Sequence, residues 1–261
     1  ALDRFEASAD FVILAVPAQA TRAAIAAIGG EALANKPVVL SAKGLETGTL
    51  LRQSEVLLAL APMARPFVLS GPSFAADVAA GRPTAVTLAG DDASETSELA
   101  AALAGPAFRL YAADDRIGVE LAGALKNVYA LACGAVEGAG LGASARSALI
   151  ARGFAELNRI IVALGGSPTT LTGLAGLGDL TLSCTSMQSR NYRYGVALGR
   201  GEPPPDLLAE GVATAPVAQL MAREQAVDAP LIDAVNLLLT GARSIDEIVA
   251  GLMSRPLKRE N

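Results

Sequence analysis

The segment FVILAVP, residues 11–17, is the stretch that decides the fold class of this 261-residue chain. Its apolar run ends at a proline, which is typical of a strand buried inside a parallel sheet. Residues 21–28 then have the composition of an alanine-rich helix, and two glycines follow them directly. A buried strand followed closely by a helix is the repeating unit of an α/β domain.

Further strand and helix patterns alternate up to residue 111. The remaining strand candidates are residues 38–41, 67–70, 85–88 and 108–111, and helical patterns lie between them at about 50–58, 73–80 and 92–103. This alternation predicts a doubly wound, mostly parallel sheet with right-handed crossovers. Pro17, Lys43-Gly44 and Gly71-Pro72 all follow predicted strand ends, which form the edge where such sheets bind ligands.

The strand signals fade beyond Tyr111. Residues 115–139 and 143–164 have long helical patterns, and shorter ones follow at about 189–199, 214–226, 231–239 and 244–252. We therefore predict two domains: a nucleotide-binding α/β domain over residues 1–112 and an all-helical domain over residues 113–261.

Composition restricts the class of protein. The net charge of -5 argues against nucleic acid as a partner. No uninterrupted apolar run reaches the roughly 18 residues of a membrane span, and no signal-peptide pattern opens the chain, so a cytoplasmic protein is expected. Cys133 and Cys184 form no CxxC pair, and a chain without histidine offers no zinc site. We expect two buried thiols and no metal.

The absence of histidine also limits the chemistry. It removes the usual general base and every Ser-His or Cys-His nucleophile arrangement. The chain has only four lysines, at positions 36, 43, 126 and 258, among 21 basic residues. Because arginine stays protonated, a desolvated lysine is the better candidate for moving a proton near neutral pH.

Two motifs lie at predicted strand ends. Lys43 stands in SAKGLE, residues 41–46, and the motif SGPSFA spans residues 70–75. A lone lysine beside glycine is commonly a solvated loop residue, and Gly-Pro is an ordinary turn. The functional alternative is that both loops face a ligand, with free N–H groups of the next helix directed at an anion or a carboxamide.

Two more motifs lie in the predicted helical domain. Lys126 sits among small and apolar residues, which predicts a buried amine with a lowered pKa. The glycines of residues 173–178 resemble a phosphate loop, but no strand precedes them and no GK[ST] follows. We expect them instead to pack tightly and direct Asp179 at Lys126. Ser189 is a predicted N-cap, which places Arg190 in the first turn of a helix, a favourable phosphate site.

Taken together, these motifs resemble the bacterial glycerol-3-phosphate dehydrogenase family. The blocks that carry the resemblance are AKGLE (42–46), SGPSFA (70–75), IGVELAGALKNVYA (117–130), ARSALIARGFAE (145–156), GLAGLGDLTLSCT (173–185) and SRN (189–191). Lys126 and Asn127 are adjacent, whereas β-hydroxyacid dehydrogenases and ketopantoate reductase space this pair three or four residues apart. The resemblance implies a Rossmann domain followed by an all-α domain of the 6-phosphogluconate dehydrogenase C-terminal type.

The resemblance also implies an activity and a set of site residues. The reaction is reversible hydride transfer between NAD(P)H and dihydroxyacetone phosphate, giving sn-glycerol 3-phosphate for glycerophospholipid synthesis. The implied catalytic residues are Lys126 as proton donor and acceptor, Lys43 as a holder of the substrate oxygen, and Asp179 as an orienting group. The implied substrate-binding residues are Lys43, Gly71, Ser73, Lys126, Asp179, Ser189, Arg190 and Asn191. The implied cofactor-binding residues are Lys43, Ala75, Arg190, Leu208 and Glu210.

One expected part of the family pattern is absent. A complete member begins with a strand, a GxGxxG-like loop and another βα unit before the segment equivalent to Phe11, and no GxGxxG occurs here. We therefore expect an N-terminally truncated Rossmann domain that holds the cofactor mainly at its nicotinamide end. The cofactor is NAD or NADP, with NADPH favoured. The oligomeric state stays open, a homodimer included.

Two alternatives to an active dehydrogenase remain. The shortened chain could be an inactive module that binds a phosphate ester or serves assembly. It could also be a related dehydrogenase for another small hydroxy acid. Substitution of Arg190 distinguishes the last alternative from a glycerol-3-phosphate dehydrogenase, because binding of a phosphate substrate should depend strongly on that side chain.

Overall fold

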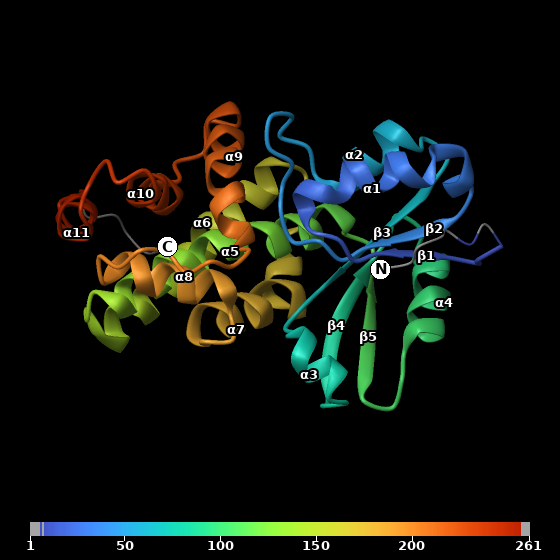
Figure 1. Cartoon of the computed structure of the whole chain (residues 1–261), viewed down its shortest axis with the longest axis horizontal. Helices are drawn as coiled ribbons and strands as arrows, with labels where there is room; N and C mark the ends of the chain where they lie inside the picture. Colours follow the sequence, from blue (N-terminus) through green and yellow to red (C-terminus); the bar gives the residue numbers. More distant parts are fainter. Residues whose placement is uncertain (1–5, 7, 257–261) are drawn as a thin grey trace.

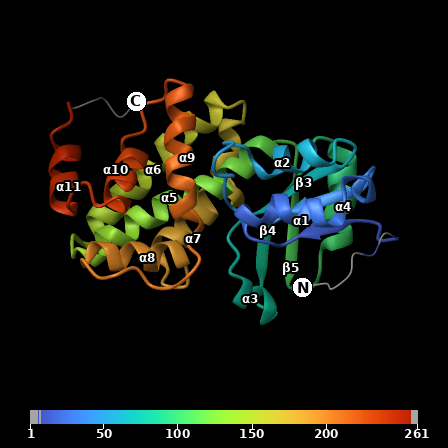
Figure 2. The ribbon, with the colours of Figure 1, turned by 45° about the horizontal axis from the view of Figure 1, so that its top comes forward.

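The computed structural model describes residue 6 and residues 8–256, and it places a sheet-containing half beside a helical half (Figures 1 and 2). The strands are β1 (Val12–Leu14), β2 (Pro37–Leu40), β3 (Arg65–Ser70), β4 (Thr84–Ala89) and β5 (Phe108–Ala113). The helices of the first half are α1 (Thr21–Ile28), α2 (Gln53–Leu60), α3 (Ala75–Ala79) and α4 (Ala93–Leu103). Those of the second half are α5 (Arg116–Gly138), α6 (Gly142–Ala163), α7 (Asp179–Thr185), α8 (Arg190–Gly199), α9 (Glu210–Glu224), α10 (Pro230–Leu239) and α11 (Ile245–Met253).

The sheet has the order β1-β2-β3-β4-β5, and only the β3–β4 pair is antiparallel. Alternate residues of β2 face opposite layers, as the pleat requires. Val38 and Leu40 pack in the cluster formed with α1 and α2, whereas Val39 packs with Phe67 and α4. Helices therefore cover both faces of the sheet, which confirms the predicted mostly parallel α/β fold.

The first strand is shorter and less buried than its apolar sequence predicts. β1 covers three residues, and Ile13 is 47% exposed although Leu14 is buried. β1 is the edge of the described sheet, so one of its faces and one of its edges lack cover. The predicted strand is therefore present and parallel to β2, but the prediction that it is buried is wrong.

The long helix α5 forms the centre of the helical half, and helices α6 to α10 pack around it, whereas α11 packs against α10 (Figure 1). Its contact with α8 is very close, because glycines line both surfaces. A Cβ atom at Gly134 would lie 2.0 Å from the carbonyl oxygen of Tyr192, and one at Gly195 would lie 2.1 Å from that of Leu131. Within the described chain α5 is the one helix long and apolar enough to cross a membrane, but its apolar window is entirely buried in the fold.

Helix α9 begins four residues earlier than predicted, at Glu210 instead of residue 214. Gly211 in its first turn is not a helix breaker here. A Cβ atom at this position would lie 2.5 Å from the carbonyl oxygen of Asn127 on α5, so glycine permits close packing of the two helices. The boundary predicted between residues 112 and 113 stays a prediction; β5 ends at Ala113 and α5 begins at Arg116.

Candidate active site

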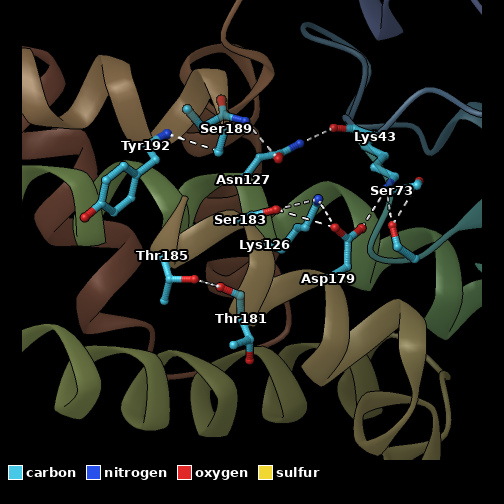
Figure 3. A network of polar contacts seen from close by, with 12 residues as sticks. Lys43, Ser73, Lys126, Asn127, Asp179, Thr181, Ser183, Thr185, Ser189 and Tyr192 are labelled. Carbon is cyan, nitrogen blue, oxygen red and sulfur yellow. Dashed lines mark hydrogen bonds and ion pairs between the residues drawn. The ribbon is translucent and has the colours of Figure 1, made fainter. Parts of the chain in front are cut away.

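Lys43 lies where the loops at the carboxyl edge of the sheet meet the helical half (Figure 3). It follows β2, and its Nζ donates to the carbonyl oxygen of Gly71, after β3, at 2.9 Å. The same Nζ donates to Oδ2 of Asp179 at 2.6 Å. Gly71 has φ +141°, and a Cβ there would lie 2.9 Å from the Cα of Val86, so this position requires glycine. One lysine thus joins two strand ends to the helical half.

Lys126 enters the same site from α5. Its Nζ donates to Oδ1 of Asp179 and to Oγ of Ser183, the latter at 2.7 Å (Figure 3). Lys126 is 6% exposed and Asp179 1% exposed. Buried charges of this kind are tolerated only when they are paired and hydrogen-bonded. The Asp179 carboxylate meets that requirement for two amines at once, one on each oxygen.

The surroundings shift the pKa of both partners. Burial and the nearby charge of Lys43 lower the pKa of Lys126 to about 8, although Asp179 acts in the opposite direction. Burial raises the pKa of Asp179, but the charges of Lys43 and Lys126 and their hydrogen bonds outweigh burial and bring it below its ordinary value. Asp179 therefore stays ionised, and Lys126 can gain or lose a proton near neutral pH.

A glycine permits this convergence. The Cβ of an alanine at position 123 would lie 2.6 Å from Oγ of Ser70 and 3.6 Å from Cγ of Lys43. The small residues beside Lys126 therefore allow the end of β3 and the Lys43 side chain to approach α5. The tight packing expected of residues 173–178 is also present, because a Cβ at Gly176 would lie 2.2 Å from the carbonyl oxygen of Leu171.

A row of side-chain amides runs alongside the two lysines. Asn127 Nδ2 donates to the carbonyl oxygen of Lys43 at 2.7 Å. Asn191 Nδ2 donates to Oδ1 of Asn127 at 2.8 Å, and the N–H of Gly211 donates to Oδ1 of Asn191 at 2.8 Å. These bonds fix the first turns of α8 and α9 relative to α5 and to the Lys43 loop.

Arg190 and Glu210 lie at the starts of these two helices. The predicted N-cap of α8 is present, since Ser189 Oγ accepts from the N–H of Tyr192 at 3.3 Å (Figure 3). Arg190 occupies the first turn and is exposed. Burial raises the pKa of Glu210, while its hydrogen bond from Ala18 and the nearby charge of Arg190 act to lower it. An exposed guanidinium at a helix N-terminus can bind an anion.

The structure brings most of the predicted site residues together. Lys43, Gly71, Lys126 and Asp179 form the central cluster, and Ser73 Oγ donates to the carbonyl oxygen of Gly71 at 3.3 Å. Ser189, Arg190, Asn191 and Glu210 lie at the adjoining helix starts. Ala75 is exposed at the start of α3 and Leu208 is 47% exposed, and no hydrogen bond of the described chain joins either to the cluster.

Two polar members of the cluster are missing from the sequence prediction. The sequence motifs assign Ser183 no role, although it lies four residues after Asp179 and therefore on the same face of a helix. Asn127 belongs to the motif around Lys126, but the resemblance assigns it no site role. Among the described residues there is no group of three His, Cys, Asp or Glu side chains that could hold a metal ion.

Comparison with known proteins agrees with this arrangement. Residues 2–96 match the family model for the NAD-dependent glycerol-3-phosphate dehydrogenase N-terminus, and residues 115–250 match that for its C-terminus. A glycerol-3-phosphate dehydrogenase [NAD(P)+] of Brucella ovis is 54% identical over 97% of this chain and 78% of its own length. Its counterpart from Chelativorans sp. is 51% identical over 97% of the chain and 77% of its own length.

Solved structures show the same relationship. The glycerol-3-phosphate dehydrogenase of Coxiella burnetii has a TM-score of 0.88 and 37% identity, covering 94% of this chain and 77% of that one. The Plasmodium falciparum enzyme, at 19% identity and a TM-score of 0.81 over 96% of this chain and 74% of its own, shares the fold. The chain belongs to the NAD-dependent glycerol-3-phosphate dehydrogenase family.

Proposed function

We propose that this protein reduces dihydroxyacetone phosphate to sn-glycerol 3-phosphate with NADH or NADPH, and catalyses the reverse reaction, as a source of the glycerol backbone of phospholipids. The observation that carries the proposal is a pair of amines, the half-buried Lys43 and the buried Lys126, on one buried carboxylate at the carboxyl edge of the sheet. Family membership and the relatives' names support it. We expect it to act in the cytoplasm, in keeping with two unpaired, buried cysteines.

Lys126 is the proposed proton-transfer residue. In the direction of reduction its ammonium group donates a proton to the carbonyl oxygen of the substrate, and the carbonyl group becomes a secondary alcohol. In the direction of oxidation its neutral amine accepts the hydroxyl proton. A pKa of about 8 suits both roles, because neither protonation state is rare near neutral pH.

Lys43 and Asp179 support this transfer. Lys43 is 20% exposed on its side chain, so its ammonium group can reach a substrate oxygen while staying bonded to Asp179. A fixed positive charge there stabilises the negative charge that develops on the oxygen. Asp179 touches both amines and holds them at a set separation. Gly71 and Ser73 line the same edge of the sheet.

The substrate phosphate is assigned to the start of α8. Arg190 supplies a guanidinium that has no hydrogen bond or ion pair within the described chain, and Ser189 and Asn191 flank it. The N-terminus of the ten-residue helix adds its partial positive charge. The neutral substrate end then faces the lysines.

The residues present fit the nicotinamide end of the cofactor, which supplies the hydride when bound. Glu210 Oε1 accepts from the N–H of Ala18 at 3.1 Å, and the described chain gives Oε2 no hydrogen-bond donor. That oxygen can accept from a carboxamide NH₂ group. Arg190 lies close enough to affect the pKa of Glu210. Ala75 and Leu208 are proposed to contact the cofactor at the rim. The chain spans about 78% of the length of its Brucella relatives.

The phosphate assignment separates this reaction from that of a hydroxyacid dehydrogenase. We expect Arg190→Met to raise the KM for dihydroxyacetone phosphate about 10- to 100-fold, because a charged hydrogen bond is lost. Arg193→Met is the matched control, since Arg193 is an exposed arginine of the same helix. The proposal is contradicted if both variants behave alike, or if hydroxypyruvate is turned over as well as the phosphate ester.

A further inference from the structure

The peptide that carries Lys43 is held from two directions. Asn127 of α5 donates to the carbonyl oxygen of Lys43 at 2.7 Å. Gln53, in the first turn of α2, donates from Nε2 to the next carbonyl oxygen, that of Gly44, at 3.0 Å. Gln53 is 0% exposed. Two consecutive carbonyl groups are thus fixed by side chains from opposite halves of the molecule.

Hydrogen bonds also connect the first turn of α2 to α5, the helix that carries Lys126. The N–H of Ser54 donates to Oε1 of Glu120 at 2.8 Å, and Ser54 Oγ donates to Oε2 at 2.6 Å. Glu120 lies on α5 and is 4% exposed. Ser54 thus donates two hydrogen bonds to one buried carboxyl group. These bonds hold α2 firmly against α5, because breaking them would leave a buried polar group without a partner.

Together these contacts form a closed path. It runs from Glu120 through Ser54 and Gln53 to the Gly44 carbonyl group, then along Lys43 and Asp179 to Lys126, which is back on α5. Position 44 has no room for a side chain, because Ala18 and α9 lie close to it. A Cβ there would lie 2.8 Å from both Ala18 Cβ and Glu210 Oε2.

We propose that Gln53 is a positioning residue for Lys43: its hydrogen bond to the Gly44 carbonyl group sets the distance between the two active-site amines, and Glu120 holds Gln53 in place through Ser54. The inference rests on the proposed function, in which both amines face one substrate. On this proposal, the buried hydrogen bonds between Glu120 and Ser54 help to position Lys43 as well as connect the two halves.

The separation of the amines has a measurable consequence. The groups that face Lys126 are Lys43, Asp179, Cys184 and the hydroxyl of Ser183. After burial, the charge of Lys43 is the main factor that lowers the pKa of Lys126. If the Lys43 loop moves away, the repulsion between the two ammonium groups weakens, and the carboxylate of Asp179 pairs with Lys126 alone. Both changes raise the pKa of Lys126.

The test is an NMR titration of the lysine Cε resonances in the folded protein. The chain has four lysines, so labelled lysine gives a spectrum simple enough to assign by substitution. We expect the Lys126 amine to titrate near 8 in the unaltered protein and about 0.5 higher or more in Gln53→Met. The kcat for dihydroxyacetone phosphate should fall about tenfold or more, because misplaced groups lose their alignment, while thermal unfolding stays cooperative.

Gln19→Met is the matched control. Gln19 Nε2 donates to the carbonyl oxygen of Leu45 at 2.7 Å, the peptide directly after Gly44, but Gln19 makes no bond to Gly44 itself. A general loosening of the loop would raise the pKa of Lys126 in both variants, and that result would overturn the proposal. An unchanged titration in a folded Gln53→Met protein would overturn it as well.

A second variant covers the case in which Gln53→Met does not fold. Glu120→Gln keeps the volume of the side chain but replaces one of the two acceptor oxygens, so the pKa of Lys126 should rise by a smaller amount. No rise in this variant contradicts the proposal. Because the titration needs no turnover, it is independent of the proposed function. A shift in an inactive protein refutes the function alone, whereas turnover without any shift refutes the positioning role alone.

Discussion

Lys43 and Lys126 donate to opposite oxygens of one buried carboxylate, that of Asp179, although they come from different halves of the chain (Figure 3). Two ammonium groups with a single counter-ion leave an excess positive charge at the carboxyl edge of the sheet. That charge attracts an anionic substrate and also makes the more buried amine a weaker base. Under the proposed function, one arrangement therefore serves both binding and proton transfer.

The reaction should have opposite pH dependence in its two directions. Reduction needs the Lys126 ammonium group, so kcat/KM for dihydroxyacetone phosphate should be level at lower pH and fall as the pH rises through about 8. Oxidation needs the neutral amine, so its rate should increase through the same range. Steady-state rates measured in both directions across this range check the prediction. Parallel profiles in the two directions would exclude Lys126 as the shared proton-transfer group.

Loss of the shared carboxylate should destabilise the fold. Asp179→Asn leaves the buried ammonium group of Lys126 and the half-buried one of Lys43 facing a neutral amide, and breaking a buried ion pair in this way costs about 3–5 kcal/mol. Urea unfolding measures the change. Asp77→Asn is the control, because it removes a surface ion pair with Arg82 and should cost less than about 1 kcal/mol. A similar loss of unfolding free energy in both variants would mean that the buried network stabilises the fold no more than a surface ion pair does.

Glu156 should make the stability of the helical half depend on pH. It is 1% exposed on α6, and its two oxygens accept the N–H groups of Leu231 and Ile232 at the start of α10, each at 3.0 Å. Burial raises the pKa of Glu156 to about 7, despite these hydrogen bonds. The folded state therefore binds the proton more tightly than the unfolded chain, whose carboxyl has its ordinary pKa of 4.5.

The sign follows from this difference. Between about 4.5 and 7 the folded protein holds more protons, so its stability falls as the pH rises through that window and is level above it. The contribution of Glu156 to this fall is at most about 3 kcal/mol. Glu156→Gln cannot titrate, so its unfolding free energy should vary less with pH. Chemical denaturation at a series of pH values compares the two proteins, and equal slopes would contradict the role of Glu156.

The crossing of α5 and α8 should tolerate no side chain. Gly195→Ala places a Cβ 2.1 Å from the Leu131 carbonyl oxygen, so the helices must separate, at a cost of about 1–3 kcal/mol or more. Gly251→Ala in α11 is the control. Nothing lies within 4 Å of its added Cβ, so it should stabilise the protein by about 0.5–1 kcal/mol through helix propensity alone. Thermal melts of both variants test the contrast, and equal effects would contradict it.

Much of the fold follows from local patterns. The mostly parallel sheet and the long α5 helix are predicted because hydrophobic periodicity and strand-end prolines report local structure directly. The start of α9 is not, since Gly211 acts as a packing residue against Asn127, and only the neighbouring helix reveals this. The exposure of Ile13 also depends on which strands flank β1, which the strand itself does not encode.

The contacts of the site also differ in whether the sequence can predict them. Lys126 and Asp179 can be paired from sequence because small residues surround the lysine and glycines precede the aspartate. The contacts of Gln53 and Glu120 cannot be predicted in this way, since each is an ordinary polar residue within a helix until α2 is placed against α5. Long-range hydrogen bonds leave no periodic signal. The roles assigned to the individual site residues stay predictions until variants are measured.

The most direct test of the account is the oxidation of NADH and of NADPH in the presence of dihydroxyacetone phosphate, measured with this chain and with its Lys126→Ala variant. We predict oxidation that requires the phosphate ester and drops at least about 100-fold in the variant, because the proton-transfer group is lost. Equal rates in the two proteins, or no turnover in either, would contradict the assignment of this site as the centre of a working dehydrogenase.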